Sequence, residues 1–412
     1  MLTSRRSPAF LFCALIWSMV CAPATAQDVE AESRAELLAK MREQKAQALQ
    51  PYEPKGIEKA LLYIEEHRVL ERFSVADGWY PIIGSLQTGA GLAGGVGYRK
   101  HLLDDQFFMN VAGAMSLKLY KAVDANAVFP SLWDNRIEVG AHLRWYDYPQ
   151  EDFFGLGPES AFENRSNYRI KGPDVKGRGF FRLRPWLFVG GELGFLFPTI
   201  EQGTDTRMPS IEQVFTDAEA PGLAAQPSFF YKTTFVELNT LDQPGNPRSG
   251  ALLRANYGAW NDRETNQFDF GRFDAVAAHF FPIFDKKRVF AARAVLSFVN
   301  NDPSSRVPFY VLPYIGGSNS VRSFREFRFR DENAFFMNFE YRWEAFAGLD
   351  MGLFMDKGKV AADWEDINFQ DLKTAYGIGF RFNTFKSVFL RIDIATGGGE
   401  GTRMFFKFSP AF

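Results

Sequence analysis

The sequence predicts an all-β membrane protein, a 16-stranded antiparallel transmembrane β-barrel preceded by a short N-terminal helical arm. Three observations lead to this fold class. The chain is rich in aromatic residues, with 44 Phe among 412 residues and 16% Phe, Trp and Tyr together. Its mean hydropathy is nonetheless −0.20, and beyond the first 26 residues no run approaches the roughly 18 apolar residues that a membrane-spanning helix needs. From Trp79 onward, apolar and polar residues alternate in stretches long enough for tilted membrane strands.

Residues 1–26 have the composition of a secretory signal peptide. Arg5 and Arg6 precede an apolar core over residues 9–20, and Ala24-Thr25-Ala26 forms a small-residue cleavage site. The apolar core is too short for a membrane anchor. Both Cys residues of the chain lie in this segment, so the mature protein is expected to contain no disulfide and no thiolate site.

Residues 27–76 predict a helical arm on the periplasmic side of the barrel. Two helical stretches, 31–50 and 56–73, are separated by a Pro-Tyr-Glu-Pro break. The first stretch is nearly all polar, and the second has a modest apolar stripe. Two arrangements remain open, a solvated arm and a helix docked at or inside the mouth of the barrel.

Residues 77–412 predict the barrel itself. Sixteen strands are expected at 80–87, 90–100, 106–117, 119–130, 135–147, 167–183, 186–197, 229–240, 249–260, 266–281, 287–300, 333–346, 348–358, 374–384, 387–395 and 402–412. An even number of strands returns both ends of the barrel to one side of the membrane. Short turns alternate with long loops, and the long loops are assigned to the exterior. The polar loop 198–228 is expected to be mobile.

Alternation is clearest in the predicted strand 333–346. One face carries Phe335, Met337, Phe339, Tyr341 and Trp343. The other face carries Asn338, Glu340 and Arg342, and Asp356 follows on the inner face of the next strand. Because large apolar residues occupy the full length of one face, we expect that face to contact lipid and the polar face to line the lumen.

The sixth external loop, 301–332, is unusually charged. Its segment 315–330 reads IGGSNSVRSFREFRFR. Charge is costly beside lipid, so the loop is expected to fold into the lumen, where Arg322 would be held by the network of Glu340, Arg342 and Asp356. A guanidinium paired with carboxylates would fix the position of the loop. In the alternative interpretation, the same charges only line a wet channel.

Other chemistries have little support in the sequence. The net charge of −2 gives no electrostatic basis for nucleic-acid binding. The G-x-G-x-x-G pattern at 89–94 continues as strand, whereas a dinucleotide site needs a helix after it. The four histidines, His67, His101, His142 and His279, are scattered without a zinc or nucleophile motif. No catalytic residue, metal site or cofactor is therefore predicted.

At the sixth loop and its expected ion-pair partners, the chain resembles the BamA/TamA superfamily of outer-membrane barrels, also called the bacterial surface antigen family. The family motif V-R-G-[FY] stands here as Val321-Arg322-Ser323-Phe324, with Ser in place of the family's Gly, and F-x-D-x-G stands as Phe354-Met355-Asp356-Lys357-Gly358. The segment 338–342 and the turn 246–250 also resemble family segments. The last strand, with Phe408 and the terminal Phe412, is similar to the C-terminal signal by which outer-membrane barrels are recognised for assembly.

The resemblance implies a protein of the bacterial outer membrane that is not an enzyme. It implies a role in the insertion, assembly or translocation of proteins, or of lipids, through a lateral seam between the first and last strands. The expected partners are outer-membrane lipids and client barrel or surface proteins, with a homodimer left open. Family members usually carry POTRA domains before the barrel, and the arm 27–76 is too short for one, so a short POTRA-less member is expected. The alternative function is a passive pore or a structural barrel.

Overall fold

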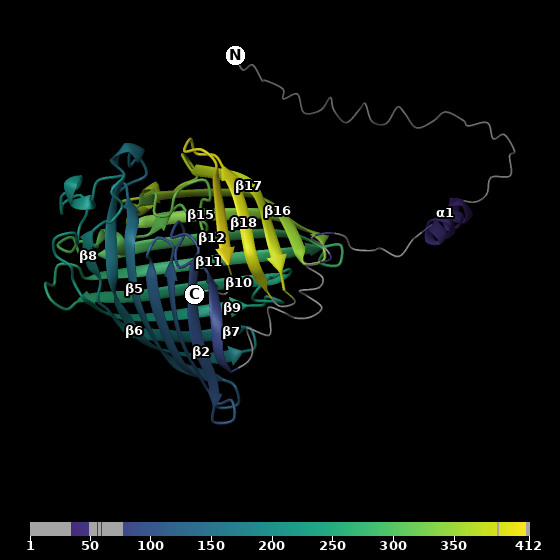
Figure 1. Cartoon of the computed structure of the whole chain (residues 1–412), viewed down its shortest axis with the longest axis horizontal. Helices are drawn as coiled ribbons and strands as arrows, with labels where there is room; N and C mark the ends of the chain where they lie inside the picture. Colours follow the sequence, from purple (N-terminus) through teal and green to yellow (C-terminus); the bar gives the residue numbers. More distant parts are fainter. Residues whose placement is uncertain (1–33, 49–55, 57–58, 60–76, 385–386, 409–412) are drawn as a thin grey trace, which may run out of the picture. The chain divides into compact units, whose positions relative to one another are not determined.

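The computed structural model of the chain describes residues 34–48, 56, 59, 77–384 and 387–408 (Figure 1). The chain divides into two compact units, residues 1–55 and 56–412. In the first unit the described element is helix α1 (Arg34–Ala48), within the first predicted helical stretch. The predicted signal segment 1–26 and nearly all of the second predicted helix lie outside the described residues. No helix among the residues described is long and apolar enough to cross a membrane.

The second unit is an antiparallel β-barrel of sixteen strands, which confirms the predicted fold class. The barrel strands are β1 (Gly78–Gly84), β2 (Ala93–Leu102), β3 (Phe107–Ser116), β4 (Lys121–Leu132), β5 (Ile137–Phe153), β6 (Ser166–Arg184), β7 (Leu187–Leu196), β9 (Phe229–Asn239), β10 (Gly250–Asp262), β11 (Phe270–Ile283), β12 (Arg288–Asn301), β15 (Asn333–Phe346), β16 (Leu349–Ala361), β17 (Lys373–Asn383), β18 (Val388–Thr396) and β19 (Arg403–Phe408). Each overlaps one of the predicted strands.

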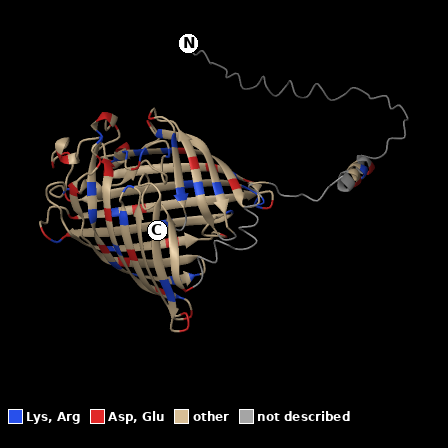
Figure 2. Ribbon diagram, viewed as in Figure 1, with Lys and Arg blue, Asp and Glu red and all other residues tan. Residues whose placement is uncertain are grey.

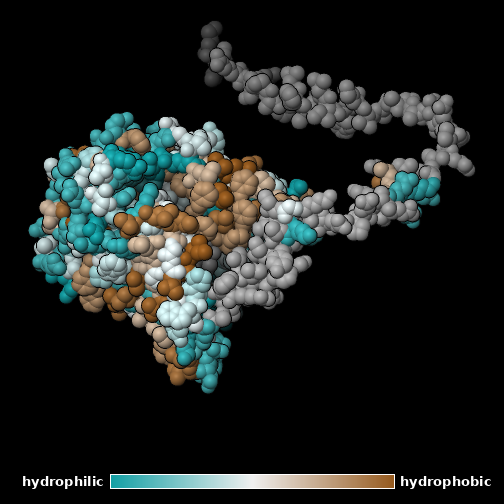
Figure 3. Space-filling model, viewed as in Figure 1, coloured by the Kyte–Doolittle hydropathy of each residue, from teal (hydrophilic) through white to brown (hydrophobic). Residues whose placement is uncertain are grey.

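The strand register places apolar side chains on the outer face of the barrel. In the β15–β16 ladder, Asn338 pairs with Asp356 and Phe339 pairs with Met355. Phe339 and Met355 are each 41% exposed, whereas Asp356 is fully buried. Because side chains of a strand alternate between its two faces, this register turns the apolar set toward lipid and the charged set toward the lumen. Figure 3 shows apolar residues gathered over strands on the visible face.

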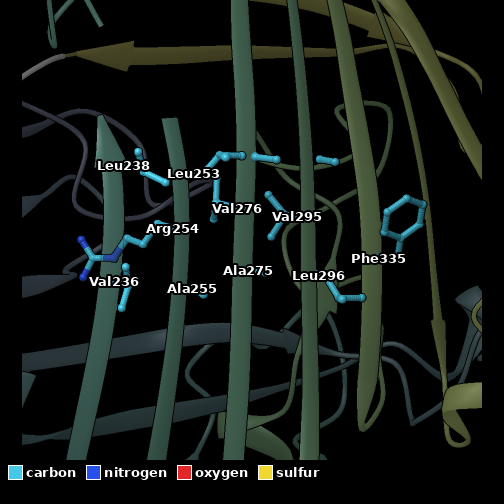
Figure 4. Close-up of a pocket in the computed structure, with 12 residues that line it drawn as sticks. Val236, Leu238, Leu253, Arg254, Ala255, Ala275, Val276, Val295, Leu296 and Phe335 are labelled. Carbon is cyan, nitrogen blue, oxygen red and sulfur yellow. The ribbon is translucent and has the colours of Figure 1, made fainter. Parts of the chain in front are cut away.

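The outer wall has a shallow apolar hollow of about 360 Å³ across β9 to β12 and β15 (Figure 4). The ladders place Ala255 opposite Ala275, Ala275 opposite Leu296 and Leu296 opposite Phe335, so all four share one face. Alanines leave a depression between the larger flanking side chains, among them Leu253. A nearly wholly apolar hollow on the lipid-facing wall is suited to acyl chains.

The external segment between β7 and β9 is folded, contrary to the mobile loop that its polar composition predicts. Strand β8 (Thr199–Gln202) extends the sheet beside β6, and the 3-10 helix η3 (Ile211–Gln213) buries Ile211 completely. Ile211 belongs to an apolar cluster with Phe215 of the same segment and with Phe153 and Phe309 from two other segments. The prediction was wrong because a few apolar anchors are enough to fix a segment that is polar on average.

The barrel wall has a seam between its first and last strands. β1 pairs with β2 and β19 pairs with β18, and β1 lies beside β19. Between β1 and the described part of β19, which ends at Phe408, there is no backbone ladder. β1 has seven residues, and the described part of β19 has six. Each of the other neighbouring strand pairs of the barrel is joined by an antiparallel ladder.

Candidate functional site

The sixth external loop, between β12 and β15, folds back against the inner side of the wall. After the 3-10 helix η4 (Phe309–Val311), a short hairpin forms between β13 (Tyr314–Ile315) and β14 (Phe329–Arg330). The residues between the two hairpin strands include the tip Val321-Arg322-Ser323-Phe324. None of these four residues is more than 2% exposed. A loop assigned to the exterior thus places its most polar segment in the protein interior.

Arg322 is the centre of the buried ion-pair network. Its Nε donates to Asp356 Oδ2 at 2.8 Å and its Nη2 donates to Asp356 Oδ1 at 2.7 Å, a bidentate contact. Its Nη1 donates to Glu340 Oε1 at 2.8 Å and to Asp393 Oδ2 at 3.4 Å. The guanidinium carbon also lies 3.4 Å from the centre of the Phe354 ring. One loop side chain therefore binds three strands, β15, β16 and β18.

Two of the three carboxylates bind further arginines of the wall. Glu340 Oε2 accepts from Arg342 Nε and from Arg381 Nη2, both at 2.7 Å. Asp393 Oδ2 accepts from Arg391 Nε at 2.6 Å. Figure 2 shows basic and acidic residues along these C-terminal strands. The structure thus brings together the predicted Arg322, Glu340, Arg342 and Asp356, with Glu340 as the shared acceptor.

The sequence interpretation missed Arg381, Arg391 and Asp393. Arg391 and Asp393 are two residues apart on β18, so they share one face, and both interrupt an otherwise apolar strand. That interruption is a usable signal of a lumen-facing pair. Arg381 has the same signature on β17, between Phe380 and Phe382.

The charges of the network compensate for its burial. Burial alone would lower the pKa of Arg322, but the charge of Glu340 and the hydrogen bonds to Asp356 outweigh it and raise the pKa above the usual arginine value. The guanidinium therefore stays protonated. A buried charge is tolerated only when it is paired and hydrogen-bonded, and removing one partner of such a pair typically costs about 3–5 kcal/mol.

The loop backbone is tied to the same strands and to the last strand. Asn338 Nδ2 donates to the Ser320 carbonyl at 2.7 Å, and Arg391 Nη2 donates to the Ser318 carbonyl at 2.7 Å. On β19, Arg403 Nε donates to the Ser323 carbonyl at 2.9 Å. The loop tip consequently braces the wall from β15 to β19, up to the seam.

Apolar packing explains the glycine of the F-x-D-x-G segment. Val321 and Phe324 are buried in a cluster with Phe336, Val360 and Ala375. A Cβ on Gly358 would lie 2.9 Å from Val321 Cγ2 and 2.8 Å from Phe336 Cβ. The absence of a side chain at 358 thus lets the loop tip approach the strand.

Serine at position 323 fits the loop tip. Ser323 is not among the described non-glycine residues with positive φ, so its backbone does not require the glycine of the family motif. Its side chain is fully buried, and its Oγ lies 3.5 Å from the Thr374 carbonyl.

A second tie lies at the short-turn end of the barrel. Residues 240–249, which we call the strap, connect β9 to β10. They include all but the last residue of the turn 246–250, which resembles a segment of the family. Arg248 Nη2 donates to both oxygens of Asp350 on β16, at 2.8 and 2.7 Å. Asn246 Nδ2 donates to Asn383 Oδ1 on β17 at 3.2 Å. The strap thus connects β10 to strands that are not its neighbours in the wall.

The remaining predicted residues are placed as follows. Phe408 ends β19 opposite Leu390, and Phe412 lies outside the described residues. His101 and His142 contact Asp77 and Asp124, respectively, and His279 lies on β11, whereas His67 is outside the described residues. Within the described ranges, no group of three or more His, Cys, Asp or Glu residues could hold a metal ion.

Comparison with known proteins agrees with this geometry. Residues 224–409, which include the strap turn, the loop tip and the network, match the Omp85 superfamily domain. Among solved structures, BamA from Haemophilus ducreyi lacking POTRA domains 1–3 is similar at 15% identity over 80% of this chain and 69% of that chain, with a TM-score of 0.59. CdiB from Escherichia coli is similar at 12% identity over 80% of this chain, with a TM-score of 0.53.

This chain spans 61% of the length of the CdiB chain. No curated protein matches the sequence. At these identities, the two solved structures show a shared fold.

Proposed function

This chain is an outer-membrane β-barrel protein that carries an Omp85 superfamily domain, and we propose that it assists the insertion or translocation of client proteins through the seam between β1 and β19. In this proposal the function is mechanical. The seam separates to admit a client strand, while the ion-pair network keeps the neighbouring wall in place.

The seam is the observation that carries the proposal. Each backbone hydrogen bond contributes about 0.5–1.5 kcal/mol net, so opening any of the long ladders would cost many such contributions. Between β1 and the described part of β19 there is no ladder to break. The edge of a strand presents unpaired donors and acceptors to which an incoming strand can pair. Pro81 within β1 further weakens that strand, because proline has no backbone N–H to donate.

The buried network supports a division of the wall into a fixed part and a movable part. Arg322 ties β15, β16 and β18 together, and Arg403 ties β19 to the loop tip. Among the described residues, β1 has a ladder to β2 only, and the loop after it contacts the sixth loop through one neutral hydrogen bond, between Thr88 Oγ1 and Ser318 Oγ at 3.0 Å. Opening would therefore move β1 and the strands that follow it away from a braced C-terminal wall.

The proposal is tested by reconstitution in liposomes. The measured quantity is the rate at which a second, urea-unfolded barrel protein inserts, compared between empty liposomes, liposomes with this protein and liposomes with Arg322→Ala. We expect the protein to accelerate insertion and the variant to lose much of that acceleration. Equal rates in empty and loaded liposomes would refute the proposal, and steady ion conductance in the same liposomes would then favour a passive pore.

A further inference from the structure

A polar cavity of about 690 Å³ lies at the external end of the barrel beside the seam. The loop after β1 contributes Thr88 and Gly89 to its lining, and the start of β19 contributes Arg403 and Phe405. The rest of the lining comes from the turn between β3 and β4, from β5, from the loop before β6, from the loop after β8 and from the sixth loop. The loop that follows β1 and the start of β19 thus both border this cavity.

Four arginines of different segments line the cavity, and one of them, Arg207, is paired with Asp205. Arg165 Nη2 donates to Asp152 Oδ1 at 2.9 Å, and Arg325 Nη1 lies 3.7 Å from the other oxygen of the same carboxylate. Arg403 also lines the cavity. Burial, followed by the neighbouring charge of Arg165, lowers the pKa of Arg325. The lining holds five basic and four acidic side chains, and the Asp152 carboxylate is shared by two guanidiniums, which leaves positive charge that an anionic ligand would neutralise.

Several polar atoms here have no hydrogen-bond partner among the residues that the structure describes. The Nε groups of Arg165 and Arg325 are buried donors without an acceptor. Glu151 lines the same cavity, is 4% exposed, and its Oε1 accepts no hydrogen bond. A buried polar group left without a partner is unfavourable. A ligand that satisfies all three must accept hydrogen bonds from guanidiniums and form one with the carboxyl group of Glu151.

The chemistry that meets both requirements is a phosphorylated sugar. Phosphate oxygens accept from arginines, often in pairs, and sugar hydroxyls both donate and accept. Phosphate oxygens can pair with Arg165 and Arg325, and a sugar hydroxyl can form a hydrogen bond with Glu151 in either protonation state of that carboxyl group. The surroundings add an apolar requirement, because Met404 lines the cavity and is 55% exposed, and Phe406 on the same face of β19 is 54% exposed. Acyl chains would lie on that face.

We propose that this cavity binds the phosphorylated saccharide head group of an outer-leaflet glycolipid, with its acyl chains along the outer face of β19. The inference goes beyond the proposed function, since it assigns a lipid partner to the external end of the seam. It also stands apart from client insertion, because lipid binding is measured without any client protein.

The test is a binding titration of the full chain in detergent micelles with four probes. The first is a bis-phosphorylated diglucosamine lipid, the second is the same lipid without phosphates, the third is phosphatidylglycerol, and the fourth is glucosamine phosphate without acyl chains. We expect saturable binding of the first probe and at least tenfold weaker binding of the other three, because each lacks the phosphates, the sugar or the acyl chains.

The variant Arg165→Gln/Arg325→Gln removes two of the four guanidiniums that line the cavity, the two that share Asp152. Arg178→Gln/Arg182→Gln, on β6 outside the cavity lining, is the matched control. Each lost charge-assisted hydrogen bond is worth a severalfold change, so we expect at least tenfold weaker binding of the first probe in the cavity variant and less than twofold change in the control. Lys118→Gln changes an exposed residue of the cavity rim and should weaken binding about threefold in a protein with an unchanged fold.

Three results would overturn the proposal. Equal loss of affinity in the cavity and control variants would mean that the glycolipid binds elsewhere. Equal affinity for phosphatidylglycerol would mean that charge alone is recognised and the saccharide is not. Equal affinity for free glucosamine phosphate would refute the membrane lipid as the source of the ligand.

Discussion

Arg322→Ala is the substitution whose effect the structure determines most closely. The variant loses four side-chain hydrogen bonds to three carboxylates. Glu340 and Asp393 each keep an arginine partner, but Asp356 keeps only Asn338 Nδ2 and the backbone N–H of residue 322. The negative charge of Asp356, which is fully buried, then has no positive charge paired with it. Breaking a buried ion pair in this way costs about 3–5 kcal/mol, which we expect as the decrease in the free energy of unfolding.

The assay is equilibrium urea unfolding of the mature chain in detergent micelles, followed by tryptophan fluorescence. The matched control is Arg178→Ala, which removes a guanidinium 3.1 Å from Glu138, where Arg178 is 41% exposed. An exposed pair of this kind contributes at most about 1 kcal/mol. Strand content from circular dichroism should be unchanged in both variants.

The second variant separates lost attraction from buried charge. Arg322→Ala/Asp356→Asn removes the orphaned carboxylate, so it should regain roughly 1–3 kcal/mol of the loss. The reasoning would be refuted if Arg322→Ala destabilised the barrel no more than the control does, or if Asp356→Asn destabilised it further.

Three further predictions concern close packing and the strap. Gly358→Ala should lower the free energy of unfolding by about 1–3 kcal/mol, because its Cβ would displace Val321 and Phe336. The control is Gly177→Ala, where a Cβ meets nothing within 4 Å. Equal effects of the two substitutions would contradict the packing argument. Arg248→Ala should release the strap from Asp350. A cysteine placed at Gln243 should then react with a soluble maleimide severalfold faster than it does when Arg248 is present. An unchanged rate would mean that Arg248 does not hold the strap. Burial would raise the pKa of Asp242, but the hydrogen bonds from Lys286 and from the backbone of Arg248 and Ser249 lower it below the ordinary value of 3.8. Its contribution to stability is thus present above pH 3.8 and lost as the pH falls through the lowered pKa. A nitroxide label attached at neutral pH to a cysteine at Gln243 should become more mobile at that acidic end in the wild type and be mobile at all pH values in Asp242→Asn, and a wild-type label mobility that does not change with pH would contradict the assignment.

The sequence predicts the strands well because lipid and lumen impose opposite requirements on successive residues. The alternation from Phe335 to Trp343 can be read directly as β15, and its boundaries match those of the structure. The pairing of Arg322 with Asp356 could be predicted from the charge of the loop and from the inward face of β16. Both inferences use local patterns together with the cost of charge beside lipid.

Other contacts have no local signature. Arg248 and Asp350 are 102 residues apart, and the strap sequence alone predicts only a turn. Ile211 and Phe215 lie in a polar segment whose average composition hides the apolar anchors that fold it. The cavity beside the seam combines residues from at least five segments, so neither Glu151 nor Arg325 stands out before the barrel closes.

The movement of the seam is tested most directly by locking it. The two cysteines lie within the predicted signal segment, so cysteine pairs placed along β1 and β19 would be the only thiols of the mature chain. A pair that forms a disulfide would then be compared with its reduced form in the liposome insertion assay. We predict that the oxidised protein loses its acceleration of client insertion and that reduction restores it. Full acceleration by the cross-linked barrel would contradict a mechanism in which the seam opens.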